Sequence, residues 1–130
     1  MNRIDILIAV DVIGALAAGS LQGNVYLVDT NQYLGSWQEG QSPLNTVGQD
    51  GQLLTWSVVA VDAASQVTIQ AFSGQMVEQK VCIPSPDPFA GDGVWNARVQ
   101  SQGRYASFPY SVTLSMNGST LTFASYLKVV

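Results

Sequence analysis

The chain has 130 residues, of which 47% are apolar and 11% are charged, and its formal net charge is −4 at pH 7. This length suits one domain with a substantial core, so we expect a single β-sandwich domain over residues 1–130. Because the chain has no histidine, it cannot form Ser-His-Asp or Cys-His nucleophile systems or the usual zinc sites. Its single cysteine excludes an intrachain disulfide. Its five basic residues are scattered along the sequence, so they do not form the basic stripe that nucleic-acid binding requires.

The N-terminal segment alternates in the manner of a β-strand. Over residues 4–12 every even-numbered residue is apolar, while Asp5 and Asp11 mark the ends of the other face and Leu7 lies between them. This pattern predicts a long strand that is covered on both faces near its centre. A short helical turn or loop over residues 14–19 and a second strand over residues 24–29 follow.

Four further strands are predicted in the middle of the chain, at residues 53–61, 67–72, 76–83 and 94–101. Turns at residues 62–66 and 73–74 separate the first three. The loop at residues 84–93 contains three prolines, which cannot donate ladder hydrogen bonds, so we expect an irregular crossing there.

The C-terminal hairpin gives the clearest pattern. Apolar residues alternate with serine and threonine from Tyr110 to Met116, and Asn117-Gly118 is the preferred pair for a two-residue type I′ turn. A register that sets apolar residues beside apolar residues on one face pairs Met116 with Ser119, Leu114 with Leu121, Val112 with Phe123 and Phe108 with Leu127.

Together these elements predict the fold class: an all-β, single-domain, immunoglobulin-like antiparallel β-sandwich of about eight strands. The longest uncharged run, residues 105–127, contains a proline and the hairpin turn, so we interpret it as two strands and expect no membrane span. Arg3 and the apolar residues after it superficially resemble a signal peptide, but two aspartates interrupt that stretch.

Candidate chemical groups are few. Cys82 lies in an apolar segment, Val81-Cys82-Ile83, and is expected to be a buried structural cysteine. Most aspartates lie in predicted turns, where their side chains bond to the local backbone, and no pair has a spacing suited to a two-carboxylate hydrolase. We therefore expect no catalytic residue and no cofactor. A calcium site from Asp87, Asp92 and loop carbonyls stays open, without a spacing that matches a known calcium loop.

Binding is the more plausible role for single residues. Trp37 lies in a stretch rich in Gly, Gln and Asn, and with Asp29 and Asn31 it could form a sugar-stacking site. Trp95 and Asn96, after the proline-rich loop, form a second candidate. The alternative for any tryptophan is a place in the core, and Trp56 and Trp95 flank apolar strand residues.

Four separate stretches resemble one family. Their order is the same as that of motifs in the PixA/AidA family of bacterial inclusion-body proteins. The stretches are residues 4–11 (IDILIAVD), 48–51 (GQDG) with 54–56 (LTW), 95–99 (WNARV) and 126–130 (YLKVV). The chain departs from the family where Ser125-Tyr126 replaces the usual Asp-Pro before the last strand, and it has only three methionines. The resemblance implies a cytoplasmic, non-enzymatic β-sandwich of bacterial inclusion bodies and supplies no catalytic residues.

Two hypotheses of function follow. The low charge fraction leaves few charges to block pairing between sheet edges, which favours a protein that self-associates into oligomers or cytoplasmic bodies. The alternative is a small carbohydrate- or ligand-binding, lectin-like module that uses Trp37 and neighbouring Asp, Asn and Gln side chains.

Overall fold

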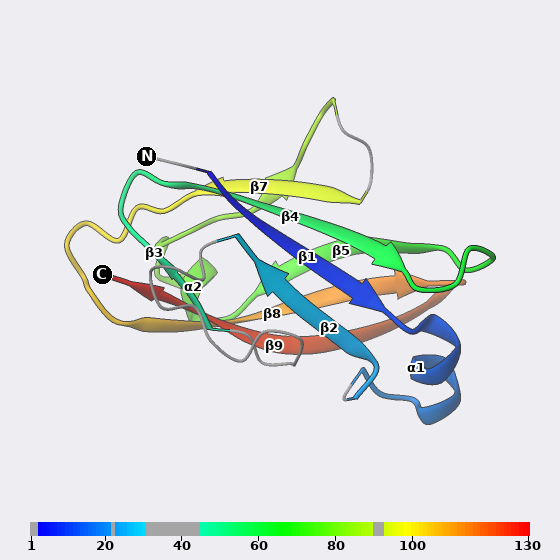
Figure 1. Cartoon of the computed structure of the whole chain (residues 1–130). Helices are drawn as coiled ribbons and strands as arrows, with labels where there is room; N and C mark the ends of the chain where they lie inside the picture. Colours follow the sequence, from blue (N-terminus) through cyan, green and yellow to red (C-terminus); the bar gives the residue numbers. More distant parts are fainter. Residues whose placement is uncertain (1–2, 22, 31–44, 90–92) are drawn as a thin grey trace.

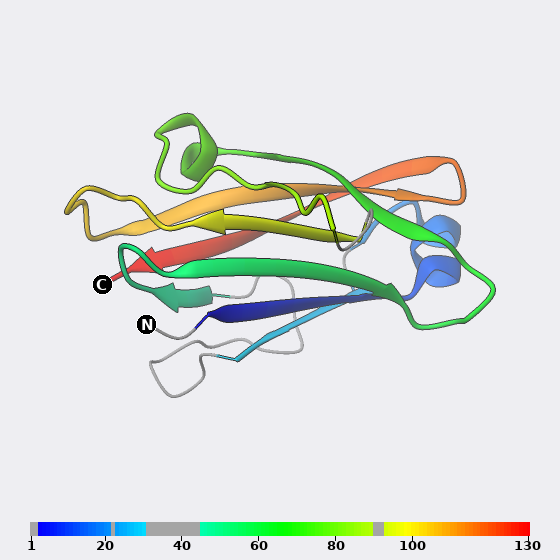
Figure 2. The same ribbon diagram turned by 90° about the horizontal axis from the view of Figure 1, so that it is seen from above.

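The computed structural model describes residues 3–21, 23–30, 45–89 and 93–130, and these form two packed β-sheets (Figures 1 and 2). The five-stranded sheet has the order β2-β1-β4-β7-β6. Its strands are β1 (Ile4–Val10), β2 (Val25–Asp29), β4 (Leu53–Ala60), β6 (Ser85–Pro86) and β7 (Val94–Arg98). The four-stranded sheet has the order β3-β9-β8-β5. Its strands are β3 (Asn45–Gly48), β5 (Val67–Ser73), β8 (Ser107–Met116) and β9 (Ser119–Val129).

The all-β sandwich expected from the sequence is confirmed, but its sheets are mixed rather than antiparallel throughout. β1 pairs with β4 in parallel, and β3 pairs with β9 in parallel. The difference arises from the order of the strands, because β3 joins the opposite sheet before the chain returns as β4 beside β1. β1 and β4 are therefore parallel neighbours. Parallel strands are joined by a long connection and not by a tight turn, so no local sequence signal predicts this pairing.

The C-terminal hairpin has the expected register. Met116 faces Ser119, Leu114 faces Leu121, and Phe108 faces Leu127 across β8 and β9. Both turn residues are left-handed, with φ of 50° at Asn117 and 86° at Gly118, as a type I′ turn requires. Local turn chemistry and the alternation of apolar residues therefore fix this part of the four-stranded sheet.

The strand expected at residues 76–83 is wrong. The chain instead forms a single turn of helix, α2 (Gln75–Glu78), followed by a non-strand segment that carries the chain from β5 in one sheet to β6 in the other. The amides of Val77 and Glu78 donate to the carbonyl oxygen of Gly74, which begins the turn. Gln, Met, Glu and Lys are good helix formers, and they outweigh the apolar residues at the two ends of this segment.

The outer face of β1 is open. Its even-numbered residues are buried, as expected, but Leu7 in the middle of the other face is exposed instead of covered. A sheet in a two-layer sandwich has a partner on one face only, so the apolar centre of the outer face remains at the surface.

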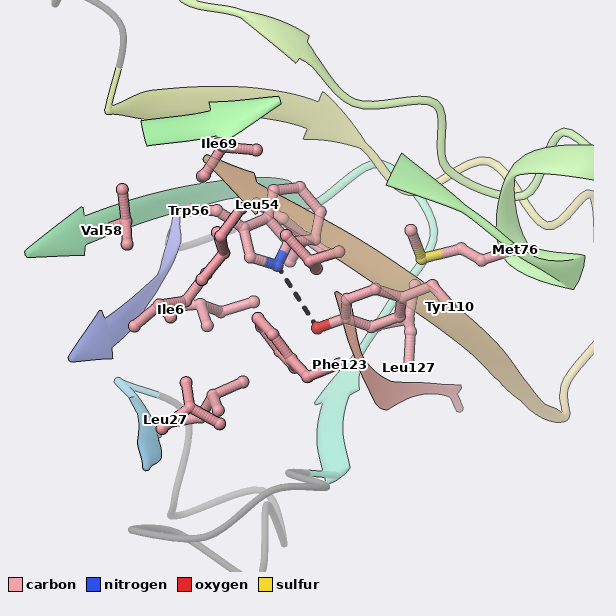
Figure 3. Close-up of a cluster of buried hydrophobic side chains, with 14 of the residues drawn as sticks. Ile6, Leu27, Leu54, Trp56, Val58, Ile69, Met76, Tyr110, Phe123 and Leu127 are labelled. Carbon is pink, nitrogen blue, oxygen red and sulfur yellow. Dashed lines mark hydrogen bonds between the residues drawn. The ribbon is translucent and has the colours of Figure 1, made fainter. Parts of the chain in front are cut away.

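Side chains from both sheets fill the core between them (Figure 3). Ile6, Leu54 and Trp56 point inward from the five-stranded sheet and meet Tyr110 and Leu127 from the four-stranded sheet. At one end α1 (Val12–Ala18) follows β1, with Asp11 Oδ1 accepting a hydrogen bond from the Gly14 amide at 3.0 Å. Among the described residues, no helix has the length and apolar character needed to cross a membrane.

Candidate functional site

A cavity of about 380 Å³ lies where one side of the sandwich is open. On this side the edge strand of the four-stranded sheet, β5, approaches the edge strand of the other sheet, β6. The cavity is lined by residues of β5, β6, β7 and β8: Thr68, Ile69, Gln70, Pro86, Trp95 and Ser115. We call it the edge cleft.

Trp95 forms the aromatic wall of the edge cleft. It lies in β7 between Trp56 of β4 and Pro86 of β6, and its ring contacts Phe72 with ring centroids 5.4 Å apart. The side chain is half-buried, so it is both packed against the core and open to the cleft. The sequence offered two interpretations of Trp95, a core residue or a binding residue. Its position in the structure allows both, because the side chain packs against the core and also lines the cleft.

The polar wall comes from β5 and β8. Thr68 pairs with Ser115 across these strands, and the regular pairing of β5 is interrupted between Ile69 and Ala71. Gln70 is the residue in this interruption, which is a β-bulge, and bulges redirect side chains at sheet edges. The sequence does not identify Thr68, Gln70 and Ser115 as lining residues, because no local pattern shows that β5 and β8 lie beside Trp95.

Asn96 does not share the site of Trp95. Neighbouring residues in a strand point to opposite faces, and Asn96 lies on the outer face of the five-stranded sheet. There its Oδ1 accepts a hydrogen bond from Thr55 Oγ1 at 2.8 Å, and its Nδ2 donates to Asp87 Oδ2 at 2.7 Å. This network ties β4, β7 and the loop after β6 together.

The other predicted binding residues are far from a cleft or lie outside the described residues. Asp29 is buried at the end of β2, where its Oδ2 accepts a hydrogen bond from Thr46 Oγ1 of β3 at 2.8 Å. This bond joins an edge strand of one sheet to an edge strand of the other. Asn31 and Trp37 lie outside the described residues, so their predicted role stays a prediction.

Several of the described carboxylates accept hydrogen bonds from other parts of the chain. Asp87 Oδ1 accepts a hydrogen bond from the Phe89 amide at 2.8 Å, and Asp92 lies outside the described residues. Hydrogen bonds from the side chain of Ser101 and from nearby amides lower the pKa of Asp50 below its usual value. Within residues 3–21, 23–30, 45–89 and 93–130, no group of three acidic or cysteine side chains is placed to hold a metal ion.

Cys82 is buried, as expected, and burial raises the pKa of its thiol to about 12. A thiol with so high a pKa carries almost no thiolate at neutral pH and is a poor nucleophile. Lys80, two residues before it, lies in the turn after α2, with φ of 58°.

A second surface feature lies on the outer face of the five-stranded sheet. Leu7, Tyr26, Val28 and Val59 are each between 38% and 48% exposed, and we call them the apolar patch. Leu7 sits beside Val28, and Ala9 sits between Tyr26 and Val59, so the patch is continuous across three strands. Its members are all uncharged, and on β1 the patch ends at Leu7, because the next residue on that face, Asp5, forms an ion pair with Arg3 at 2.8 Å.

Comparison with known proteins gives a family and several similar solved structures. The model of the family described as "Domain of unknown function (DUF8788)" matches residues 2–122. The crystal structure of an inclusion body protein (PixA) from Burkholderia cenocepacia J2315 is similar in fold, with a TM-score of 0.76, 9% identity, and coverage of 99% of this chain and 96% of that chain. No curated protein gives a significant sequence match.

A further structural similarity is partial. An endo-fucoidan hydrolase of glycoside hydrolase family 107 matches with a TM-score of 0.43 and 11% identity, covering 85% of this chain but 17% of that chain. At these values the match says nothing about activity. The similarity to the inclusion body protein supports the fold that the PixA/AidA resemblance implied, and at 9% identity it concerns the fold alone.

Proposed function

This chain belongs to the family described as "Domain of unknown function (DUF8788)", and from that premise we propose that it is a non-enzymatic protein whose copies associate through the apolar patch. The observation that carries this proposal is the patch itself. It places apolar side chains from β1, β2 and β4 side by side at the surface. Contiguous apolar surface of this kind is typical of a protein interface.

The occupant we propose for this surface is a second copy of the same chain. β2 is an edge strand of the sheet and carries two members of the patch, Tyr26 and Val28. An apolar face on the last strand of a sheet allows copies to pack face to face or to extend the sheet. With a net charge of only −4, repulsion between copies is weak.

The resemblance to a family of inclusion-body proteins agrees with assembly of many copies. The similar fold of a protein whose name is inclusion body protein supports the same idea, although the likeness by itself concerns the fold. The proposal keeps the cytoplasmic location that the PixA/AidA resemblance implies. It also keeps the absence of catalysis, which accords with the inert thiol of Cys82 and with the hydrogen bonds that engage Asp50 and Asp87.

Light scattering of the purified chain over a concentration series tests the proposal. We expect the mean mass to rise with concentration, and sodium sulfate to increase the associated fraction, because this salt strengthens the burial of apolar surface. Association through charges would instead weaken as salt is added. A chain that stays monomeric over the whole series would contradict self-association.

A further inference from the structure

We propose that the edge cleft binds a small, neutral, polyhydroxylated ring, that is, a pyranose sugar. This site is separate from the apolar patch, because the cleft is lined by residues of β5, β6, β7 and β8, whereas the patch lies on β1, β2 and β4. The ligand would therefore bind whether or not the copies associate.

The lining of the cleft combines two kinds of surface. Trp95, Pro86 and Ile69 supply apolar area, while Thr68 and Ser115 supply hydroxyl groups. Gln70 adds a primary amide, which can donate and accept hydrogen bonds. All six described lining residues are uncharged at neutral pH, so none of them can balance the charge of an ionised ligand.

A pyranose matches both surfaces. Its C–H face is apolar and packs on an aromatic ring, and its hydroxyl groups need partners that both donate and accept. The volume of about 380 Å³ lies within the range of about 300–1,000 Å³ that is usual for small-molecule sites. A smaller hollow of about 200 Å³ is also lined by Thr68 and Ser115 and extends to Asn117 and Gly118. It could hold a second sugar ring beside the one in the edge cleft.

The scaffold holds the cleft in place before any ligand arrives. Trp95 is fixed by antiparallel pairing with β4 and β6 and by its contact with Phe72. Thr68 and Ser115 are fixed by their pairing across β5 and β8, and Gln70 is directed by the bulge. Binding to such a preformed site costs little ordering of the protein.

The test is an NMR titration of the ¹⁵N-labelled full chain with glucose, galactose, mannose, N-acetylglucosamine, maltose and lactose, with glycerol as a polyol that has no ring. We expect at least one sugar to give saturating shifts at the Trp95 indole and at the amides of Thr68 and Ser115, and glycerol to give none. Absence of saturating shifts with every sugar, or shifts centred elsewhere, would overturn the proposal.

Matched variants separate binding from folding. Gln70→Ala and Ser115→Ala change polar groups of the cleft, while Gln100→Ala and Ser111→Ala change the same residue types at positions that do not line it. We expect each cleft variant to bind about five- to tenfold more weakly, as the loss of one hydrogen bond implies, and each control to bind like the wild type. Equal effects in the two pairs would contradict the site.

Discussion

Trp56 of β4 and Tyr110 of β8 join the two sheets through a hydrogen bond in the middle of the core. The Nε1 of Trp56 donates to the Oη of Tyr110 at 3.3 Å, and the rings meet edge to face with centroids 6.0 Å apart (Figure 3). Both side chains are fully buried. The Tyr110 hydroxyl also forms a hydrogen bond with the side chain of Ser125 in β9. One buried oxygen therefore connects β8 and β9 of the four-stranded sheet with β4 of the five-stranded sheet.

Tyr110→Phe should therefore destabilise the fold. The change removes the acceptor of a buried indole N–H, and a buried donor left without a partner costs about 1–3 kcal/mol of unfolding free energy. Urea unfolding followed by fluorescence measures the loss. Tyr105→Phe, at a residue that is 67% exposed, is the control and should change stability by less than about 0.5 kcal/mol. Equal stability of Tyr110→Phe and the wild type would show that the bond adds nothing.

Gly74, which precedes α2, lies close against the backbone of β8. Its φ of 101° and ψ of −175° belong to a region that only glycine occupies readily, and a Cβ there would meet the Cα of Tyr110 at 2.9 Å. Gly103 has φ of 84°, and no atom lies within 4 Å of a Cβ built there. Gly103→Ala is therefore the control: it introduces backbone strain without a clash and should lower the unfolding free energy by about 1–2 kcal/mol. We expect Gly74→Ala to cost at least about 1 kcal/mol more than Gly103→Ala in thermal or urea unfolding.

A result in which the two glycine variants are equally stable would contradict this close approach.

Cys82 should make stability fall with rising pH. Burial raises the pKa of its thiol from 9.0 to about 12, so between these values the folded state keeps a proton that the unfolded state has lost. Its stabilising contribution is present in full below pH 9 and is lost as the pH approaches 12, with a slope of up to about 1.4 kcal/mol per pH unit. Burial also raises the pKa of Tyr110, which adds to the loss above pH 10.

Urea unfolding between pH 9 and 10 isolates the cysteine, because this window lies below the ordinary pKa of tyrosine. We expect the wild type to lose stability across the window and Cys82→Ala to lose clearly less. The same slope in both proteins would show that the thiol is not the titrating group.

The sequence predicted the elements whose signals are local. Alternation placed β1, β2, β4 and β5 within a few residues of their ends, and the Asn117-Gly118 turn fixed the register of the hairpin. What it could not predict depends on contacts between distant segments. The parallel pairing of β1 with β4 follows from the path of the whole chain. The helical turn at α2 was missed for a different reason, because its helix-forming residues lie between apolar ends that resemble a strand.

The candidate sites divide in the same way. Trp95 was identified because a tryptophan beside polar residues is informative by itself. Its partners in the edge cleft were not, because Gln70 reaches the cleft through a bulge and Ser115 through the pairing of β5 with β8. Asn96 was grouped with Trp95 by sequence proximity, although successive strand residues point to opposite faces.

The most direct test of self-association through the apolar patch is light scattering of two matched double variants. Val28→Lys with Val59→Lys places two charges in the patch, and Ile83→Lys with Tyr105→Lys places the same two charges at exposed apolar residues outside it. We predict that the patch variant stays monomeric at concentrations where the wild type and the control variant associate, because burying a charge against apolar surface is costly. Association of the patch variant to the same mass as the wild type would contradict the account.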